Sequence, residues 1–300
     1  MTPALLAEIA QRYQRQAAEA PTPLTGGEES AVWRLATDGG TIVVRVSPAW
    51  RTVAELQWVH DLIRFTAQAI PEVVKPLAAA DGSTIFLHAG QPVGVFPFVE
   101  GKALDREDSG LQQDAAILLA RLHQATSAWP GYRVRPPSGP AAPMPWSAER
   151  DLQALLDADL DTWHATEFRS AQLPAGPIHG DYYRRNLLCL DGHICGVIDW
   201  DESHIAPYLE EVAWATWEFA KVPSGDDLYP ARALVFFQAY CEAGGLCQKS
   251  DWHRVVPLIR WHLREEIRRS LGAAERGEEW DQTYMEEEIR AFQRLRCHTL

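Results

Sequence analysis

Three polar residues in one short stretch have the types and the spacing that phosphoryl transfer requires. Asn186 follows Asp181 by five residues, and Asp199 follows Asn186 by thirteen. The reaction needs metal ions on the phosphates, a residue that orients the attacking hydroxyl, and positive charge near the phosphates. Mg²⁺ prefers oxygen ligands and takes one or two of them from the protein. We therefore expect Asn186 and Asp199 to bind Mg²⁺, and Asp181 to accept the hydroxyl proton or hold the hydroxyl in line.

A hairpin between these residues should bring them together. The stretches Leu187–Leu190 and His193–Ile198 flank Asp191-Gly192, a dipeptide that is typical of a two-residue turn. Because the chain then folds back on itself, Asp199 should return close to Asn186. The sequence thus predicts a metal-binding and hydroxyl-binding cluster at one end of a hairpin.

The first hundred residues are predicted to form a small antiparallel sheet with one inserted helix. Asp38-Gly39-Gly40 is typical of a tight turn and makes Ala31–Val46 a hairpin. Residues 52–66 carry apolar side chains at spacings of three and four, which indicates an amphipathic helix. A further helix is expected within residues 4–18. The β-rich stretches are Ala31–Thr37, Thr41–Val46, Thr84–Leu87 and Val93–Val99.

After Gly101 the sequence becomes mainly helical. Residues 130–145 are rich in Pro, Gly and Ala, which favours an irregular connection or lid. We expect a sheet lobe of residues 1–98 and a helical lobe of residues 99–300, divided near residues 97–101. The helices are predicted at residues 112–126, 150–168 and 208–221 and over most of the last eighty residues.

With this order of elements, the chain resembles the aminoglycoside phosphotransferase/choline kinase family, which shares the protein-kinase fold. The resemblance rests on His179-Gly180-Asp181 with Asn186 and on Ile198-Asp199-Trp200-Asp201. The Asp-x-x-x-x-Asn spacing matches the kinase catalytic loop. The resemblance implies an α+β, bilobal fold in which the nucleotide lies between a small antiparallel-sheet lobe and a larger helical lobe. It also implies transfer of the γ-phosphoryl group of Mg²⁺-bound ATP or GTP to a hydroxyl of a small molecule.

The resemblance also predicts the nucleotide contacts, with one departure. The family has a strand lysine that contacts the phosphates and pairs with a glutamate on the following helix. Here the matching strand offers Arg45, whose planar guanidinium can grip phosphate oxygens. Glu55 is the expected partner of Arg45, and the alternative is a solvated surface glutamate. The loop over the phosphates would be residues 26–30, including Gly27 and Ser30.

The segment around Pro97 occupies the position of the hinge that binds the edge of the base. Pro97 offers its carbonyl oxygen and Val99 its N–H, and this pair does not separate adenine from guanine. His179 is expected to brace the catalytic loop rather than to transfer protons. Glu211 is expected to anchor that loop, and a surface helix glutamate is an equally good interpretation.

The acceptor site should be lined by the helical lobe, from residues near 130–165 and from the C-terminal helices. Tryptophans with nearby glutamates could hold an amino-bearing substrate by cation–π contact and charge. The plainer interpretation, which we favour, is that the tryptophans fill the core and the glutamates solvate helix faces. Family substrates include homoserine, choline and aminoglycoside antibiotics, so antibiotic inactivation lies within the family's range. The residues concerned are Trp214, Trp217, Trp261, Trp280, Glu265, Glu266 and Glu286–Glu288.

The composition excludes some classes of protein. A net charge of −13 argues against binding nucleic acid, whose affinity depends on neutralising phosphates. No apolar run approaches the length of a membrane-spanning helix, and no N-terminal signal sequence is evident. The five scattered cysteines form no C-x-x-C pair, which fits a reducing compartment. We therefore expect a cytoplasmic protein; the sequence does not predict the oligomeric state.

Two other functions remain as alternatives. A catalytically silent, kinase-like protein that binds a nucleotide or another ligand would explain Arg45, although Asp181, Asn186 and Asp199 are all present. Phosphorylation of a protein is disfavoured because no activation loop of useful length follows Asp199.

Overall fold

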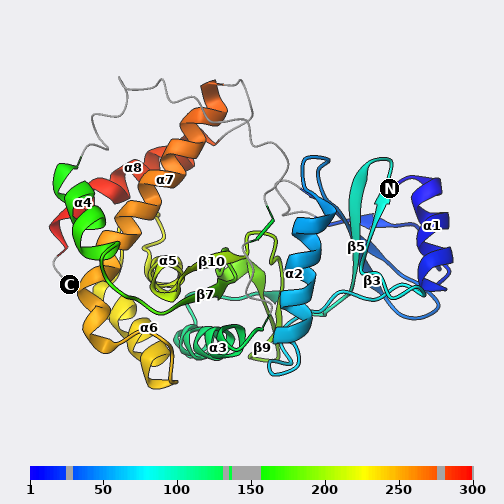
Figure 1. Cartoon of the computed structure of the whole chain (residues 1–300), viewed down its shortest axis with the longest axis horizontal. Coiled ribbons are helices and arrows are strands. Elements are labelled where there is room, and N and C mark those ends of the chain that lie inside the picture. Colours follow the sequence, from blue (N-terminus) through cyan, green and yellow to red (C-terminus); the bar gives the residue numbers. More distant parts are fainter. Residues whose placement is uncertain (25–29, 131–134, 137–156, 276–280, 299–300) are drawn as a thin grey trace.

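A sheet-rich part and a larger helical part lie side by side in the computed structural model of the chain (Figure 1). The sheet-rich part contains the N-terminus, and the helices of the C-terminal half form the other part. The structure describes residues 1–24, 30–130, 135–136, 157–275 and 281–298.

The N-terminal sheet is antiparallel, with the strand order β1-β2-β3-β5-β4. Along β3, Ile42, Val44 and Val46 are buried on one face, so Arg45 lies on the other. Helix α1 (Pro3–Tyr13) adds Leu5 to the apolar cluster on the first face. The strands are β1 (Thr22–Pro23), β2 (Ala31–Leu35), β3 (Ile42–Val46), β4 (Ile85–His88) and β5 (Gln91–Pro97).

Helix α2 (Val53–Thr66) connects the sheet to the helical part. Its N-cap Thr52 accepts a hydrogen bond from the N–H of Glu55 at 3.1 Å, and Glu55 lies in the first turn, where the helix dipole favours negative charge. The apolar face of α2, including Val59 and Leu62, packs into the larger core that the helical part builds. Helix α2 therefore shares a core with residues beyond 98, and the predicted boundary at that residue stays a prediction.

The helical part is built around α3, a 19-residue helix whose apolar face is fully buried. The N-cap Asp108 accepts hydrogen bonds from the N–H groups of Gly110 and Leu111. The helices are α3 (Ser109–Ser127), α4 (Ala158–Trp163), α5 (Tyr208–Ala220), α6 (Pro230–Glu242), α7 (Val255–Glu275) and α8 (Gln282–Arg294). Shorter helical turns are Arg184–Asn186, Lys249–Arg254, Leu295–Cys297 and the π-helical turn His164–Phe168.

Short strands lie in the segments that connect these helices and in the segment before α3. They are β6 (Lys102–Ala103), β7 (Ala175–Ile178), β8 (Leu187–Leu190), β9 (His193–Val197) and β10 (His204–Pro207). Strands β6, β8 and β9 form one antiparallel sheet, and β7 pairs with β10.

Most of the helix and strand predictions are confirmed. The predicted helices at 52–66, 112–126 and 208–221 correspond to α2, α3 and α5, and the four β-rich stretches correspond to β2, β3, β4 and β5. The first helix ends at Tyr13, earlier than expected, because Gln14 adopts a left-handed backbone conformation. Most of the predicted lid at 130–145, and the first part of the predicted helix at 150–168, lie outside the described residues. No helix within the described ranges is long and apolar enough to cross a membrane.

Candidate active site

The predicted hairpin is confirmed, and it brings Asp199 back beside Asn186. Asp191 and Gly192 both have a positive φ, 51° and 78°, as a type I′ turn requires. Leu187 at the start of β8 faces Val197 at the end of β9. Beyond this pair, the N–H of Ile198 donates to the carbonyl oxygen of Asn186 at 3.0 Å. Asp199 is the next residue, so the chain leaves the hairpin with Asp199 close to Asn186.

Asn186 is hydrogen-bonded to the other predicted catalytic residue. Its Nδ2 donates to Asp181 Oδ2 at 2.8 Å and to the main-chain oxygen of Asp181 at 2.9 Å. Because the amide nitrogen faces Asp181, the amide oxygen is directed elsewhere and suits a metal ion. The structure therefore brings Asp181, Asn186 and Asp199 into one cluster.

Asp181 has the electrostatic properties of a proton acceptor. Burial raises the pKa of Asp181 to about 7, the negative charge of Asp199 adds to this rise, and the hydrogen bond from Asn186 opposes it. A base works best when its pKa lies near the operating pH. The environment of Asp181 therefore suits it to accept a proton near neutral pH.

Glu211 holds the loop that carries Asp181. Its carboxylate is buried and accepts hydrogen bonds from the N–H of Gly180 at 2.6 Å and of His179 at 3.1 Å. It also accepts from His123 Nε2 at 2.8 Å. Burial opposes its ionisation, but the hydrogen bond and charge of His123 give Glu211 a net lowered pKa. The expected anchoring role is confirmed, and the alternative of a surface glutamate is wrong.

His179 braces the same loop, as expected. Its Nε2 lies 2.9 Å from the carbonyl oxygen of Ile198, and its Nδ1 accepts from the N–H of Asp181 at 3.2 Å. Burial lowers the pKa of His179 despite the opposing charge of Glu211, so the ring is neutral and donates through Nε2. The ring thus ties the loop to the end of the hairpin.

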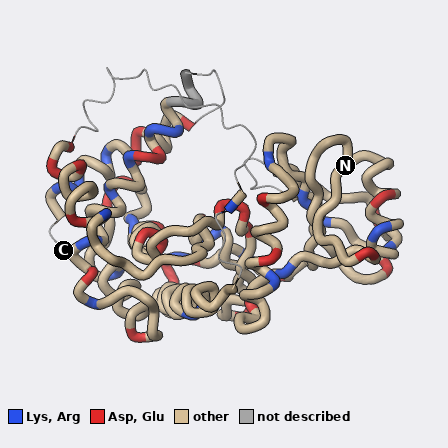
Figure 2. The backbone as a smooth tube through the Cα atoms, viewed as in Figure 1, with Lys and Arg blue, Asp and Glu red and all other residues tan. Residues whose placement is uncertain are grey.

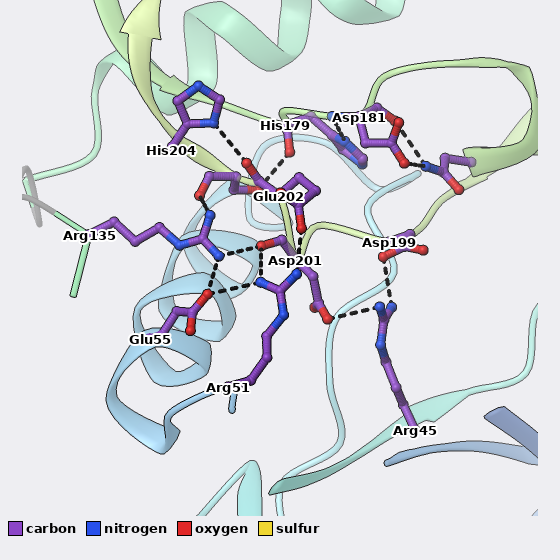
Figure 3. Close-up of polar contacts among 12 residues, drawn as sticks. Arg45, Arg51, Glu55, Arg135, His179, Asp181, Asp199, Asp201, Glu202 and His204 are labelled. Carbon is purple, nitrogen blue, oxygen red and sulfur yellow. Dashed lines mark hydrogen bonds and ion pairs between the residues drawn. The ribbon is translucent and has the colours of Figure 1, made fainter. Parts of the chain in front are cut away.

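Arg45 reaches from β3 to the residues after the hairpin (Figure 3). One guanidinium nitrogen lies 2.8 Å from Asp199 Oδ1, and another lies 2.8 Å from Asp201 Oδ2. Burial opposes the charge of Arg45, but the two aspartates raise its pKa above the ordinary value. The ion pairs of Arg45 are thus with these aspartates, and the predicted pair with Glu55 is wrong.

Glu55 has other partners and is completely buried, so the alternative of a solvated glutamate is also wrong. Its Oε1 accepts from Arg51 at 2.9 Å and makes a second ion pair with Arg135 (Figure 3). Sequence reasoning missed both arginines. Arg51 could have been found, because it lies four residues before Glu55, whereas Arg135 lies in the Pro-rich stretch without any local signal.

The predicted metal ligands fit a magnesium ion that arrives with a nucleotide. Among the described residues, no group of three or more His, Cys, Asp and Glu could hold a metal ion by itself. A nucleotide-bound Mg²⁺ needs only one or two protein oxygens, since phosphates and water complete its shell. The side chain of Asp199 is 33% exposed and already attracts a cation, the guanidinium of Arg45. The donor set of Asn186 and Asp199 therefore suits Mg²⁺.

Three of the remaining predicted nucleotide contacts, Ser30, Pro97 and Val99, lie at or near the ends of strands. Pro97 is the last residue of β5 and pairs with Ile42 of β3. The N–H of Phe98 donates to the carbonyl oxygen of Thr41, so Val99 is the first residue after this strand pairing ends. Ser30 precedes β2 and is buried. Gly27 lies outside the described residues. The roles of these four residues stay predictions.

Carboxylates continue from Asp181 into the helical part. Glu218 on α5 raises the pKa of Asp181 and also that of Glu288 on α8. Glu288 is 3% exposed, and a hydrogen bond with the hydroxyl of Tyr284, one turn earlier on α8, acts to lower its pKa. Burial, followed by the charge of Glu266 on α7, raises the pKa of Glu288 to about 8.

The interpretation that the tryptophans fill the core and the glutamates solvate helix faces is confirmed only in part. Glu286 is exposed, and Glu265 pairs with Arg268 on the surface of α7, where acidic and basic residues alternate (Figure 2). Trp217 is buried, whereas Trp280 lies outside the described residues. Glu288 contradicts the prediction, because it is buried next to other carboxylates.

The two other tryptophans are only partly buried, and each stacks on a histidine. Trp214 of α5 lies against His262 with ring centres 4.0 Å apart. Trp261 lies against His164 with ring centres 3.4 Å apart. These rings are packed against the core without being fully enclosed by it.

Comparisons with known proteins agree with this geometry. The profile of the Phosphotransferase enzyme family matches residues 21–258. A homoserine kinase of Bradyrhizobium sp. (strain ORS 278) is 26% identical over 227 residues, which cover 72% of this chain and 69% of the relative.

Solved structures of small-molecule kinases have the same fold. An amicoumacin kinase in complex with AMP-PNP, Ca²⁺ and its ligand superposes with a TM-score of 0.72, at 15% identity, over 97% of this chain and 92% of that one. A microcompartment-associated aminopropanol kinase gives 0.69, at 16% identity, over 99% and 95%. The predicted α+β, protein-kinase-like fold is thereby confirmed. The chain belongs to the Phosphotransferase enzyme family and is a small-molecule kinase that phosphorylates a hydroxyl group.

Proposed function

We propose that this kinase transfers the γ-phosphoryl group of Mg²⁺-bound ATP to the hydroxyl of a small amino alcohol, with Asp181 as the base. The observation that carries the proposal is the position of Asp181. It is held by Asn186, its pKa is raised to about 7, and it lies within the electrostatic reach of both Asp199 and Glu218. The base thus lies near both the proposed metal ligand Asp199 and Glu218 of the helical part.

The reaction follows from these positions. The substrate oxygen attacks the γ-phosphorus while its proton passes to a carboxylate oxygen of Asp181, and the bond between the γ-phosphorus and the β–γ bridging oxygen breaks. The products are the phosphorylated acceptor and ADP. Asn186 and Asp199 would hold Mg²⁺, which neutralises charge on the phosphates. The use of AMP-PNP and Ca²⁺ in the amicoumacin kinase complex supports an adenine nucleotide and a divalent cation.

Arg45 supplies the positive charge for the phosphates in this proposal. A guanidinium can bind two phosphate oxygens at once, and Arg45 already lies against the proposed metal ligand Asp199. When a nucleotide binds, the phosphates would offer Arg45 new anionic partners next to Asp199 and Asp201. Pro97 and Val99 remain the proposed contacts for the base, and Gly27 and Ser30 for the phosphates.

The proposed acceptor carries an amino group because of the buried glutamates. Burial disfavours the ionised form of Glu288, and a protonated amine beside it would stabilise that charge. Glu218 and Glu266 also lie near it, and each has a cation of its own, Lys221 for Glu218 and Arg269 for Glu266. Homoserine and aminopropanol, the compounds that the names of two similar kinases contain, both carry an amino group and a hydroxyl group.

A panel assay tests the proposal. The protein is incubated with Mg²⁺-ATP and with amino alcohols, their amine-free analogues, sugars and aminoglycosides, and phosphorylated products are detected by mass spectrometry. We expect phosphorylation of amino alcohols over amine-free analogues, and none with Asp181→Asn. Equal turnover of the amine-free analogues would refute the acceptor class. Nucleotide binding without turnover of any compound would instead favour the silent-protein alternative.

The proposed location is the cytoplasm. The five cysteines are all free thiols, as expected in a reducing compartment, which is also where ATP is available.

A further inference from the structure

We infer that Arg135 and Arg51 are positioning residues that hold the proposed metal-binding turn, residues 199–203, in the conformation that presents Asp199. The inference rests on the proposed function, because it takes Asp199 as a ligand of the nucleotide-bound metal. In this inference both arginines act through the main chain of the turn.

Arg135 donates hydrogen bonds to two main-chain carbonyl groups of this turn. One guanidinium nitrogen donates to the main-chain oxygen of Ser203 at 2.8 Å, and the other donates to the main-chain oxygen of Asp201 at 2.6 Å. The second nitrogen also makes an ion pair with Glu55 on α2. A planar guanidinium can serve three such acceptors in one plane, whereas the single ammonium of a lysine cannot. Figure 3 shows Arg135 between α2 and the turn.

Arg51 makes a second, parallel set of contacts. It donates to the same main-chain oxygen of Asp201 at 3.0 Å and to Glu55 at 2.9 Å, and it forms an ion pair with Glu202. Arg51 and Arg135 thus share both Glu55 and the carbonyl of Asp201. Glu55 is the carboxylate that holds the two guanidinium groups together next to the turn.

The turn needs such support because its backbone is strained. Asp199 has a φ of +62°, a left-handed conformation that is unfavourable for a residue with a side chain. A strained residue persists only where its surroundings hold it. The N–H of Ser203 donates to the carbonyl oxygen of Trp200 at 2.9 Å, and the arginines fix the carbonyls of Asp201 and Ser203. These contacts hold the backbone of the turn directly after Asp199.

Binding of AMP-PNP, measured by calorimetry with Mg²⁺ and again with EDTA, tests this role without an acceptor. For Arg135→Met we expect affinity for Mg²⁺-AMP-PNP to fall about tenfold, and affinity for metal-free AMP-PNP to change less than about twofold. Arg135→Lys should also lose affinity for Mg²⁺-AMP-PNP, because one ammonium nitrogen cannot take the positions of the two guanidinium nitrogens that bind the two carbonyls. The matched control is Arg232→Gln, which removes an exposed ion pair between Arg232 on α6 and Glu107. This variant should bind Mg²⁺-AMP-PNP as tightly as wild type does.

The outcomes separate this inference from the proposed function. Asp199→Asn should also weaken only Mg²⁺-dependent binding; if it does not, Asp199 is not the metal ligand and the proposed function fails. If Asp199→Asn shows the metal-specific loss and Arg135→Met binds Mg²⁺-AMP-PNP like wild type, only the present inference is overturned. An equal loss with and without metal would also overturn it, since that is the signature of a general structural role. Should Arg135→Met not fold, Arg135→Lys and Glu55→Gln are judged by the same criterion.

Discussion

The α-carbon of Gly180 packs directly against the main-chain oxygen of Glu202. A β-carbon at position 180 would lie 2.1 Å from that oxygen, closer than any real contact, and Gly180 also has a φ of +86°. The loop that carries Asp181 and the turn that carries Asp199 therefore touch at a point where only glycine fits.

Gly180→Ala should separate these two segments and reduce turnover about a hundredfold, because a displacement of 1 Å in a catalytic group has an effect of that size. Gly192→Ala is the matched control. It has a similar φ, +78°, but a β-carbon there would meet no atom within 4 Å. Steady-state kinetics of both variants with the acceptor from the panel assay measure the effect. Equal losses would show that backbone strain alone, and not the contact with Glu202, is responsible.

Asp181→Asn should reduce kcat by about 10²–10⁴, the usual contribution of a general base, with little change in nucleotide affinity. In the wild type, kcat should rise with pH and level off above about 7, because Asp181 accepts a proton only in its ionised form. The pH profile of kcat under saturating substrates tests this expectation. A profile that is flat between pH 5 and 9 would exclude Asp181 as the base.

The raised pKa of Asp181 also has a consequence for stability. The folded protein binds this proton more tightly than the unfolded chain, with a pKa of about 7 against 3.8, so the free energy of unfolding should fall as pH rises between these values. Asp181→Asn removes the titrating group and with it this pH-dependent fall in the free energy of unfolding. The variant should therefore melt at a higher temperature than wild type at pH 8, with the difference disappearing near pH 4. Thermal melts at both pH values provide the measurement.

Glu211→Gln should destabilise the protein by about 2–4 kcal/mol, because one carboxylate oxygen that accepts buried N–H groups is replaced by a donor. The N–H groups of His179 and Gly180 would then lack a full set of acceptors. Glu265→Gln, on the exposed face of α7, is the control and should cost less than about 1 kcal/mol. Denaturant titration compares the two, and similar midpoints for both variants would contradict the anchoring role.

Glu288→Gln should raise KM for an amino alcohol about tenfold and leave KM for ATP unchanged, because a buried charge partner of the ammonium is lost. In the wild type the acceptor KM should fall as pH rises through about 8, since Glu288 binds a cation better once it is ionised. This dependence should be absent in the variant. The measurement is acceptor KM between pH 6.5 and 9, with the amine-free analogue as a control. An unchanged KM in the variant would place the amine elsewhere.

The parts of the site that were predicted correctly have local signals. Asp191-Gly192 specifies a two-residue turn by itself, and the turn then fixes where Asp199 lies relative to Asn186. Glu211 was predicted from the family resemblance, as the residue that best matches an acidic residue shortly after the metal-binding motif. Such features can be predicted because neighbouring residues, or a match to a motif, leave few candidate positions in the sequence.

The pairing of charges could not be predicted in the same way. Glu55 has three arginines within the site as candidate partners, and the choice among them depends on distances that only the folded chain sets. Arg45 leaves β3 on the face toward the hairpin and meets Asp199 and Asp201 first. Arg135, far away in sequence, then takes the position at Glu55. Long side chains have many rotamers, so sequence spacing alone does not decide between such partners.

The contact between Arg45 and Asp199 also affects the order in which ligands can enter. In the structure, an internal counter-ion already neutralises the carboxylate that a divalent cation would use. A free cation must displace the guanidinium without offering it a new anion, whereas a cation chelated by a triphosphate brings the replacement with it. If Asp199 binds the metal as proposed, metal and nucleotide are therefore favoured to arrive as one complex, and the nucleotide-free protein should bind free Ca²⁺ or Mg²⁺ only weakly.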